Sequence, residues 1–260
     1  MAVIDVSAFV GTYPFGDLGG AGSAGWLTGQ MDRLGVEQAW VGYLPSILQL
    51  DPTPGNRALE KITASFGDRL RAVPTINPEL PRWQDDLNRA LEIGAPAVRL
   101  FPQYQGIDPA GDEIRVVLAA AAVAGMPAIL TVRLEDERQR HPLDVAPELS
   151  AAAVRALVRS DERARLIVAN ANAAFVEEVH FGLTQDEAAQ LLWDIAWIWG
   201  PPADDLARLL DTVGHERFAF GSGMPLRVPD VAAAKLDLID LAEDVREAIL
   251  GENVRRWMGQ

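Results

Sequence analysis

The sequence contains no cysteine, and only three of its 260 residues are histidine. The absence of cysteine excludes disulfide bonds, thiolate metal sites and a cysteine nucleophile. No apolar run approaches the ~20 residues that a membrane span requires. The first residues, MAVIDV, also lack the basic region and the cleavage site of a signal peptide. From these absences we predict a cytoplasmic protein without a membrane partner.

Basic residues are also scarce, since 23 Lys and Arg face 37 Asp and Glu, for a net charge of −14. Nucleic acids bind clustered Lys and Arg, so this charge argues against a nucleic-acid partner. The hydrophobic content of 49% and the charged content of 23% are typical of a globular protein. No linker, repeat or low-complexity segment divides the chain, so we predict one domain over residues 1–260.

Short apolar segments alternate with amphipathic ones, the pattern of a parallel α/β fold. We predict strands at residues 3–6, 38–43, 70–76, 97–101, 128–132, 166–169, 191–198 and 218–220. Predicted helices include residues 25–34, 147–158, 201–213 and a C-terminal segment, 231–258, broken near Gly251. Eight such units indicate a single (β/α)8 TIM-type barrel with an extra C-terminal helix. A doubly wound open sheet is the alternative, because counting strands does not prove closure.

The stretch RFAFGSGMPLR, residues 217–227, contains the last predicted strand. Gly221 and Gly223 flank Ser222 and allow a sharp turn, and Pro225 prevents a helix from starting at once. This stretch resembles the last strand of the amidohydrolase-related metal-dependent hydrolases and decarboxylases, which ends F-G-S-D-x-P. In that family the aspartate is a metal ligand and a proton acceptor. Gly223 takes its place here.

Further motifs resemble the same family over nearly the whole chain. They are IDVSAFVG at 4–11, AVRLFP at 97–102, GMPAILT at 125–131, LIVAN at 166–170 and ILGENVRR at 249–256. The resemblance implies descent from a metal-dependent enzyme and places the family's metal ligands at Ser7, Phe9, Thr131, Asn170 and Gly223. A hydroxyl is a poor ligand and a phenyl ring is none. We therefore predict no metal, no cofactor and no metal-dependent hydrolysis.

The barrel fold restricts where catalytic groups can lie, because its active sites form at the carboxyl ends of the strands. His180 ends a predicted helix and His215 precedes the last strand, so both belong at the opposite end. Candidate acid–base groups at the carboxyl ends of the strands are Glu135, His141 and Asp194. For Glu135 and His141 the alternative is a solvated loop.

Arg99 is the leading candidate for ligand binding, because it shares a strand face with Ala97 and Phe101 and is predicted to point into the barrel. A buried cation needs either an ion pair, with Asp5 or Asp194, or an anionic ligand. Both interpretations stay open. The complete predicted ligand-binding set is Ser7, Arg99, Arg133, Asn170, Trp199, Ser222 and Arg227. For Arg133 and Arg227, at the strand ends, solvated charges are the alternative. We predict that the ligand is a small anion such as a carboxylate.

Residues 13–24 are rich in glycine, and Gly20-x-Gly22-x-x-Gly25 matches the dinucleotide fingerprint as text. That motif must follow a strand directly, and it does not here. We predict a mobile lid over the barrel mouth instead.

Three hypotheses of function follow from these patterns. The first is a metal-free barrel that binds a small molecule or is catalytically inactive. The second is a metal-independent hydrolase, lyase or isomerase. The third is a structural partner of an active homologue. A homo-oligomer is compatible with each of them.

Overall fold

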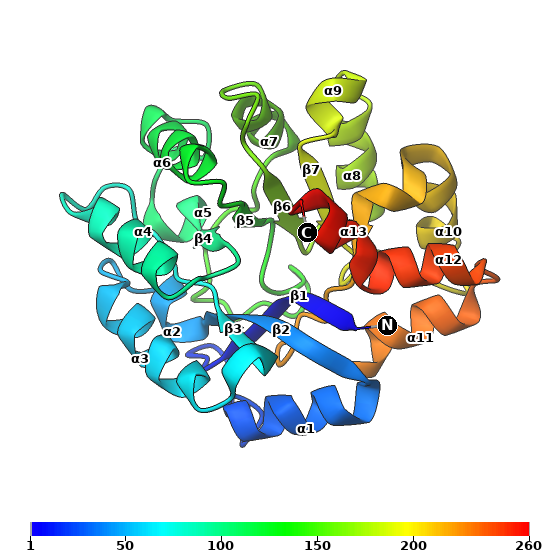
Figure 1. Ribbon diagram of the computed structural model, residues 1–260, viewed down its shortest axis with the longest axis horizontal. Helices are drawn as coiled ribbons and strands as arrows, with labels where there is room; N and C mark the ends of the chain where they lie inside the picture. Colours follow the sequence, from blue (N-terminus) through cyan, green and yellow to red (C-terminus); the bar gives the residue numbers. More distant parts are fainter. Residues whose placement is uncertain (1, 260) are drawn as a thin grey trace.

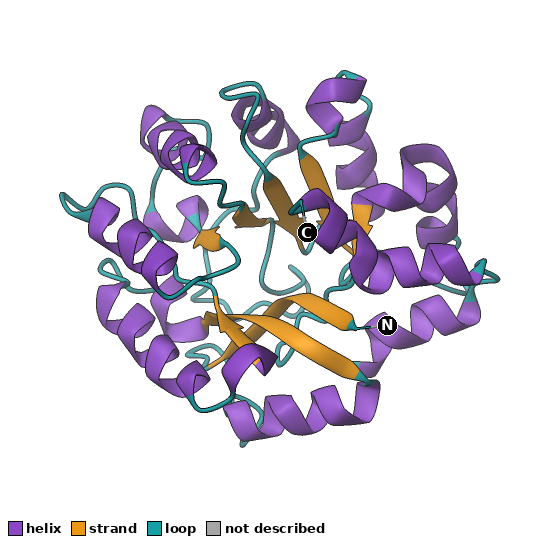
Figure 2. Ribbon diagram, in the orientation of Figure 1, coloured by secondary structure: helices purple, strands orange, loops and turns teal. Residues whose placement is uncertain are grey.

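The computed structural model describes residues 2–259 as eight parallel strands surrounded by helices (Figure 1). The strands are β1 (Val3–Val10), β2 (Val36–Tyr43), β3 (Leu70–Ala72), β4 (Val98–Leu100), β5 (Ala128–Thr131), β6 (Leu166–Ala169), β7 (Leu191–Asp194) and β8 (Phe218–Ala219). Figure 2 shows these strands at the centre and the helices on the outside. The predicted α/β class and barrel architecture are therefore confirmed.

The helices follow the strands in the expected alternation. They are α1 (Ala24–Leu34), α2 (Leu44–Ile47), α3 (Thr53–Ala64), α4 (Trp83–Glu92), α5 (Pro102–Gln105), α6 (Asp112–Val123), α7 (Ala151–Val158), α8 (Ala173–His180), α9 (Gln185–Ala188), α10 (Asp205–Leu209), α11 (Asp230–Leu238), α12 (Glu243–Glu247) and α13 (Asn253–Trp257). Helix α1 shows how local sequence sets the bounds. The Ser23 side chain accepts a hydrogen bond from the Trp26 N–H, and Gly35 ends the helix in the left-handed conformation. No helix of the described residues is both long enough and apolar enough to cross a membrane.

Hydrogen bonds between β1 and the segment after β8 close the barrel. The ladders form two sets, β1–β2–β3 and β4 to β8, which a bridge between Thr75 and Arg99 joins. On the other side the Val6 N–H donates to the Phe220 carbonyl at 3.0 Å, and the Phe9 N–H donates to the Met224 carbonyl at 2.8 Å. Closure on both sides excludes the open sheet.

The C-terminal helix α13 covers the amino-terminal end of the barrel. Its Val254 packs among interior strand residues such as Ile4 and Ile167, and Figure 1 shows α13 in front of the barrel axis. The predicted C-terminal segment is interrupted at Ile239–Ala242, between α11 and α12. Gly251 instead lies in a π-helical turn, Ala248–Glu252, so the predicted break was wrong in position.

Several predicted boundaries were also wrong. Strand β1 runs four residues past the predicted end, as far as Val10, because its far half pairs with β2. Strands β3 and β7 end early, and the chain after β7 turns back where the Ile198 N–H donates to the Ile195 carbonyl. Helix α7 begins after its cap Ser150 rather than at Pro147, and α10 begins only at Asp205.

Candidate functional site

Buried polar side chains gather inside the barrel, near the carboxyl ends of the strands. This polar centre consists of Asp5, Ser7, Arg99, Thr131, Asn170, Asp194 and Ser222. Buried polar atoms are normally hydrogen-bonded. Here several have no partner among residues 2–259: Ser7 Oγ, Thr131 Oγ1, Asn170 Oδ1, Asp194 Oδ2 and the Nε and Nη1 of Arg99. Because converging polar groups of this kind fix a ligand, the polar centre is the candidate site.

Asp5 and Ser222 join the two ends of the chain within this centre. Asp5 Oδ1 accepts the N–H groups of Ser7 and Ser222, both at 3.0 Å, and its Oδ2 accepts the Ser222 hydroxyl at 2.5 Å. Burial raises the pKa of Asp5, and the hydrogen bond from the Ser222 side chain opposes this. The hydroxyl proton of Ser222, predicted to meet a ligand, is therefore engaged within the chain. This hydrogen bond links β1 to the segment after β8.

Asp194 and Asn170 form a second pair, at the ends of β7 and β6. Asp194 Oδ1 accepts the Asn170 N–H at 2.9 Å, and Asn170 Nδ2 donates to the Arg133 carbonyl at 2.7 Å. Asn170 has a φ of 60°, a left-handed conformation that asparagine tolerates better than most residues. Burial raises the pKa of the Asp194 carboxyl. The pair thus presents an amide oxygen and a carboxyl oxygen that make no hydrogen bond with described residues.

Arg99 is fully buried and stacks on Phe9. Its guanidinium carbon lies 4.2 Å from the centre of the Phe9 ring. Nη2 donates long hydrogen bonds of 3.4 Å to the carbonyls of Val6 and Ala8. No carboxylate of residues 2–259 lies within 4.0 Å of the guanidinium, so the direct ion pair with Asp5 or Asp194, one of the two open interpretations, does not form. Burial lowers the pKa of Arg99 to about 10, and the charges of Asp194 and Asp5 oppose this shift.

Two further arginines surround Trp197 at the rim of the barrel. The guanidinium carbons of Arg227 and Arg133 lie 4.3 Å and 5.4 Å from the indole ring. Arg133 is also paired with Glu148 at 2.9 Å, and burial lowers the pKa of Arg227. The Trp197 side chain is buried and lies between these two cations. Trp199, a member of the predicted ligand-binding set, is 60% exposed.

Glu135 and His141 lie against the glycine-rich segment. The Tyr13 hydroxyl donates to Glu135 Oε2 at 2.8 Å, and Phe15 stacks on His141 with 5.6 Å between ring centres. One buried apolar cluster joins this segment to the barrel: Phe9, Tyr13, Leu44, Ile47, Phe101 and Leu134. Glu135 and His141 thus connect the loop after β5 with the glycine-rich segment.

Lys235 is a residue that sequence reasoning missed. It lies on α11, is buried, and donates to the carbonyls of Ile195 and Ala196 at 2.7 and 2.9 Å. Burial, together with the charge of Arg227, lowers its pKa to about 7. Lys235 shares the buried face of α11 with Ala232 and Leu236. This helical spacing could have predicted its burial from the sequence. Lys235 holds the turn that carries Trp197.

Comparisons with known proteins agree on one family and one fold. A family model described as Amidohydrolase matches residues 50–259. No curated protein matches the chain. Among solved structures, 2,6-dihydroxybenzoate decarboxylase from Rhizobium is 14% identical, with a TM-score of 0.76 over 99% of this chain and 98% of that one.

Two other solved structures have similar folds. A putative amidohydrolase from Staphylococcus aureus is 14% identical, with a TM-score of 0.75 and full coverage of both chains. A dihydroxybenzoic acid decarboxylase from Polaromonas, with bound manganese and the inhibitor 2-nitroresorcinol, is 12% identical. Its TM-score is 0.73, over 99% of this chain and 97% of that one. At these identities the likeness concerns the fold.

Proposed function

Because the chain belongs to the amidohydrolase family, we propose that it binds a small carboxylate at the polar centre through arginine, without a metal ion. The observation that carries this proposal is the state of Arg99. Its guanidinium is fully buried, has no carboxylate within 4.0 Å among the described residues, and leaves Nε and Nη1 without partners. A buried cation of this kind is stabilised by an anion, and a carboxylate matches the planar guanidinium.

The donor atoms at the family's metal positions do not fit a divalent ion. Phe9 has no donor atom, and Gly223 has no side chain. A Cβ built on Gly223 would lie 2.9 Å from Arg227 Cδ, so arginine fills the space that an aspartate would use. Ser7 and Thr131 supply only neutral hydroxyls, which bind such ions poorly. Within residues 2–259 no three His, Cys, Asp or Glu side chains are grouped to hold a metal.

The second candidate function is that of a metal-independent enzyme, and the buried carboxyl of Asp194 supports it. Burial raises its pKa, and the hydrogen bond from the Asn170 N–H and the nearby Ser7 side chain oppose this shift. A buried carboxyl with a raised pKa is a candidate for proton transfer at a functional site. The chemistry would then be hydrolytic, lyase or isomerase turnover of the bound acid, with Asp194 moving the proton at Oδ2.

Thermal denaturation with matched ligands tests the binding proposal. We expect benzoate and other small acids to raise the melting temperature, and the matching amides and alcohols to leave it unchanged. Arg99→Met should remove the response. Arg115→Met, on the exposed face of α6, is the matched control and should keep it. An equal response to acids and amides would contradict the proposal. Turnover that Asp194→Asn abolishes would favour the second candidate.

A further inference from the structure

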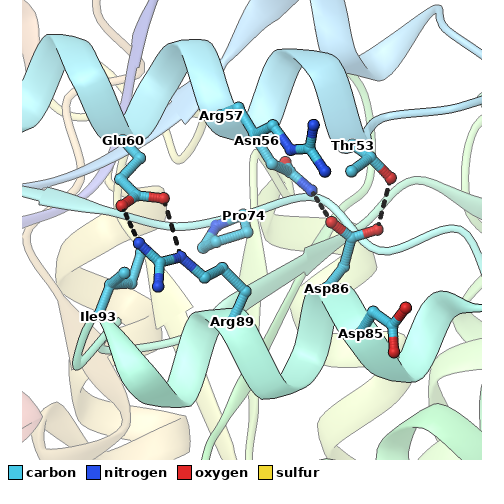
Figure 3. A pocket seen from close by; sticks show the side chains of 9 residues that line it. All are labelled: Thr53, Asn56, Arg57, Glu60, Pro74, Asp85, Asp86, Arg89 and Ile93. Carbon is cyan, nitrogen blue, oxygen red and sulfur yellow. Dashed lines mark hydrogen bonds and ion pairs between the residues drawn. The ribbon is translucent and has the colours of Figure 1, made fainter.

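A cleft lies between α3 and α4 on the outside of the barrel (Figure 3). Its volume is about 410 Å³, and an adjoining hollow of about 460 Å³ shares Thr53, Arg57, Asp85 and Asp86 with it. The cleft has no lining residue in common with the polar centre. It is therefore a second candidate binding site, independent of the proposed carboxylate function.

One wall of this cleft carries a buried carboxylate held only by neutral donors. Asp86, on α4, is 8% exposed. It accepts the Thr53 hydroxyl at 2.9 Å and the Asn56 amide at 3.2 Å. Asn56 is fixed in turn by two hydrogen bonds with the backbone of Thr75. No Lys, Arg or His of residues 2–259 lies within 4.0 Å of Asp86, so its charge has no direct counter-ion.

The other wall carries an arginine without a partner. Arg57, on α3, makes neither a hydrogen bond nor an ion pair with any residue from 2 to 259. The remaining charges of the cleft are already neutralised: Arg89 Nε pairs with Glu60 at 3.1 Å, and Arg82 Nε pairs with Asp85 at 2.6 Å. Figure 3 shows the Arg57 and Asp86 side chains extending from α3 and α4 into the same space.

We propose that this cleft binds a small zwitterion of the α-amino acid class. The ligand's ammonium group would donate to Asp86, and its carboxylate would accept from Arg57. Pro74 and Ile93, which line the same cleft, would contact an apolar side chain. A ligand with only a negative charge would be repelled by Asp86, and a ligand with only a positive charge would be repelled by Arg57. A zwitterion satisfies both.

Calorimetric titration with glycine, L-leucine and L-phenylalanine tests the charge requirement. We expect at least one of them to bind, and its N-acetyl and amide derivatives to bind about tenfold or more weakly, because each derivative lacks one charge. If none of the three amino acids binds, or if the derivatives bind equally well, the proposal is wrong.

The variant Arg57→Met locates the binding. Arg57 is exposed and unpaired among the described residues, so its replacement should leave the melting temperature unchanged while removing amino acid binding. Arg115→Met, an exposed arginine on α6, is the matched control and should bind normally. Full binding by Arg57→Met would place the ligand elsewhere and overturn the proposal. Acid binding at the polar centre should be the same in both variants, which separates this test from that of the proposed function.

Discussion

The Arg99 guanidinium stacks on the Phe9 ring in the interior of the barrel, with 4.2 Å between the guanidinium carbon and the ring centre. By the family resemblance, Phe9 stands where a metal-coordinating histidine would lie. The aromatic face attracts a cation, as a histidine would attract a metal ion, but it offers no lone pair. Positive charge at the centre of this barrel therefore comes from a side chain of β4.

The first prediction concerns metal content. We expect tag-free protein supplied with manganese or zinc to retain far less than one ion per chain after dialysis against a chelator, because Phe9 and Gly223 offer no ligand. Elemental analysis measures it. The variant with Ser7→His and Phe9→His serves as a comparison, since it restores two imidazoles to one strand face. Stoichiometric metal in the unmodified protein would contradict this prediction.

The second prediction is a pH effect at Asp5. Burial raises its pKa above the ordinary 3.8, so the folded state holds the proton more tightly than the unfolded state. The free energy of unfolding therefore falls as pH rises from 3.8 through the raised pKa, by at most about 1.4 kcal/mol per pH unit. Asp5→Asn keeps an oxygen for the N–H groups of Ser7 and Ser222 and does not titrate.

Urea unfolding of both proteins from pH 4 to pH 8 checks this effect. Relative to Asp5→Asn, the unmodified protein should lose stability as pH increases. Two parallel stability curves would show that Asp5 does not titrate in this window.

The third prediction concerns Lys235, whose pKa is lowered by burial, whereas that of Asp5 is raised. Its pKa falls from 10.5 to about 7, so the unfolded state holds more protons between these values. Stability attributable to this group therefore increases with pH across that window. Lys235→Met should lack this increase in stability. Lys61→Met, which replaces an exposed lysine on α3, should retain it. Denaturant unfolding at pH 7 and pH 9.5 measures the difference, and an equal increase in all three proteins would refute the assignment.

The fourth prediction concerns the glycine-rich lid. Tyr13 is 6% exposed and hydrogen-bonds to Glu135, so this contact anchors residues 13–24. Tyr13→Phe should accelerate hydrogen exchange in that segment, while global stability changes by about 1 kcal/mol or less. Glu135→Gln keeps an acceptor for the hydroxyl and should exchange slowly, like the unmodified protein. Rapid exchange in both variants, or in neither, would argue against the anchor.

The strand pattern could be predicted because each strand is a short apolar run followed by a helix with regular spacing. The interior could be predicted less well. Arg99 was placed inside by alternation with Ala97 and Phe101, but its stacking on Phe9 depends on two strands that are far apart in sequence. Pairing across the barrel has no local signal, so the sequence could not decide whether Arg99 pairs with Asp5 or Asp194.

Loops gave the least predictable residues. Glu135 and His141 lie in one loop, and the sequence predicts them as acid–base groups only from residue type and from their place after a strand. Their contacts with Tyr13 and Phe15 depend on how two separate loops meet over the mouth. Lys235 was missed because a lysine near a helix end is ordinarily solvated, and only its place beside Leu236 marks it as buried.

The hydrogen bonds between β1 and the segment after β8 have a consequence for synthesis on the ribosome. Asp5 and Ser222, which they bring together, are 217 positions apart. Translation at about 5–20 residues per second leaves the first strand without its last neighbour for roughly ten seconds or more. During that interval one edge of β1 is unpaired and open to other chains. The nascent protein is therefore exposed to misassembly through β1 until the segment after β8 has emerged.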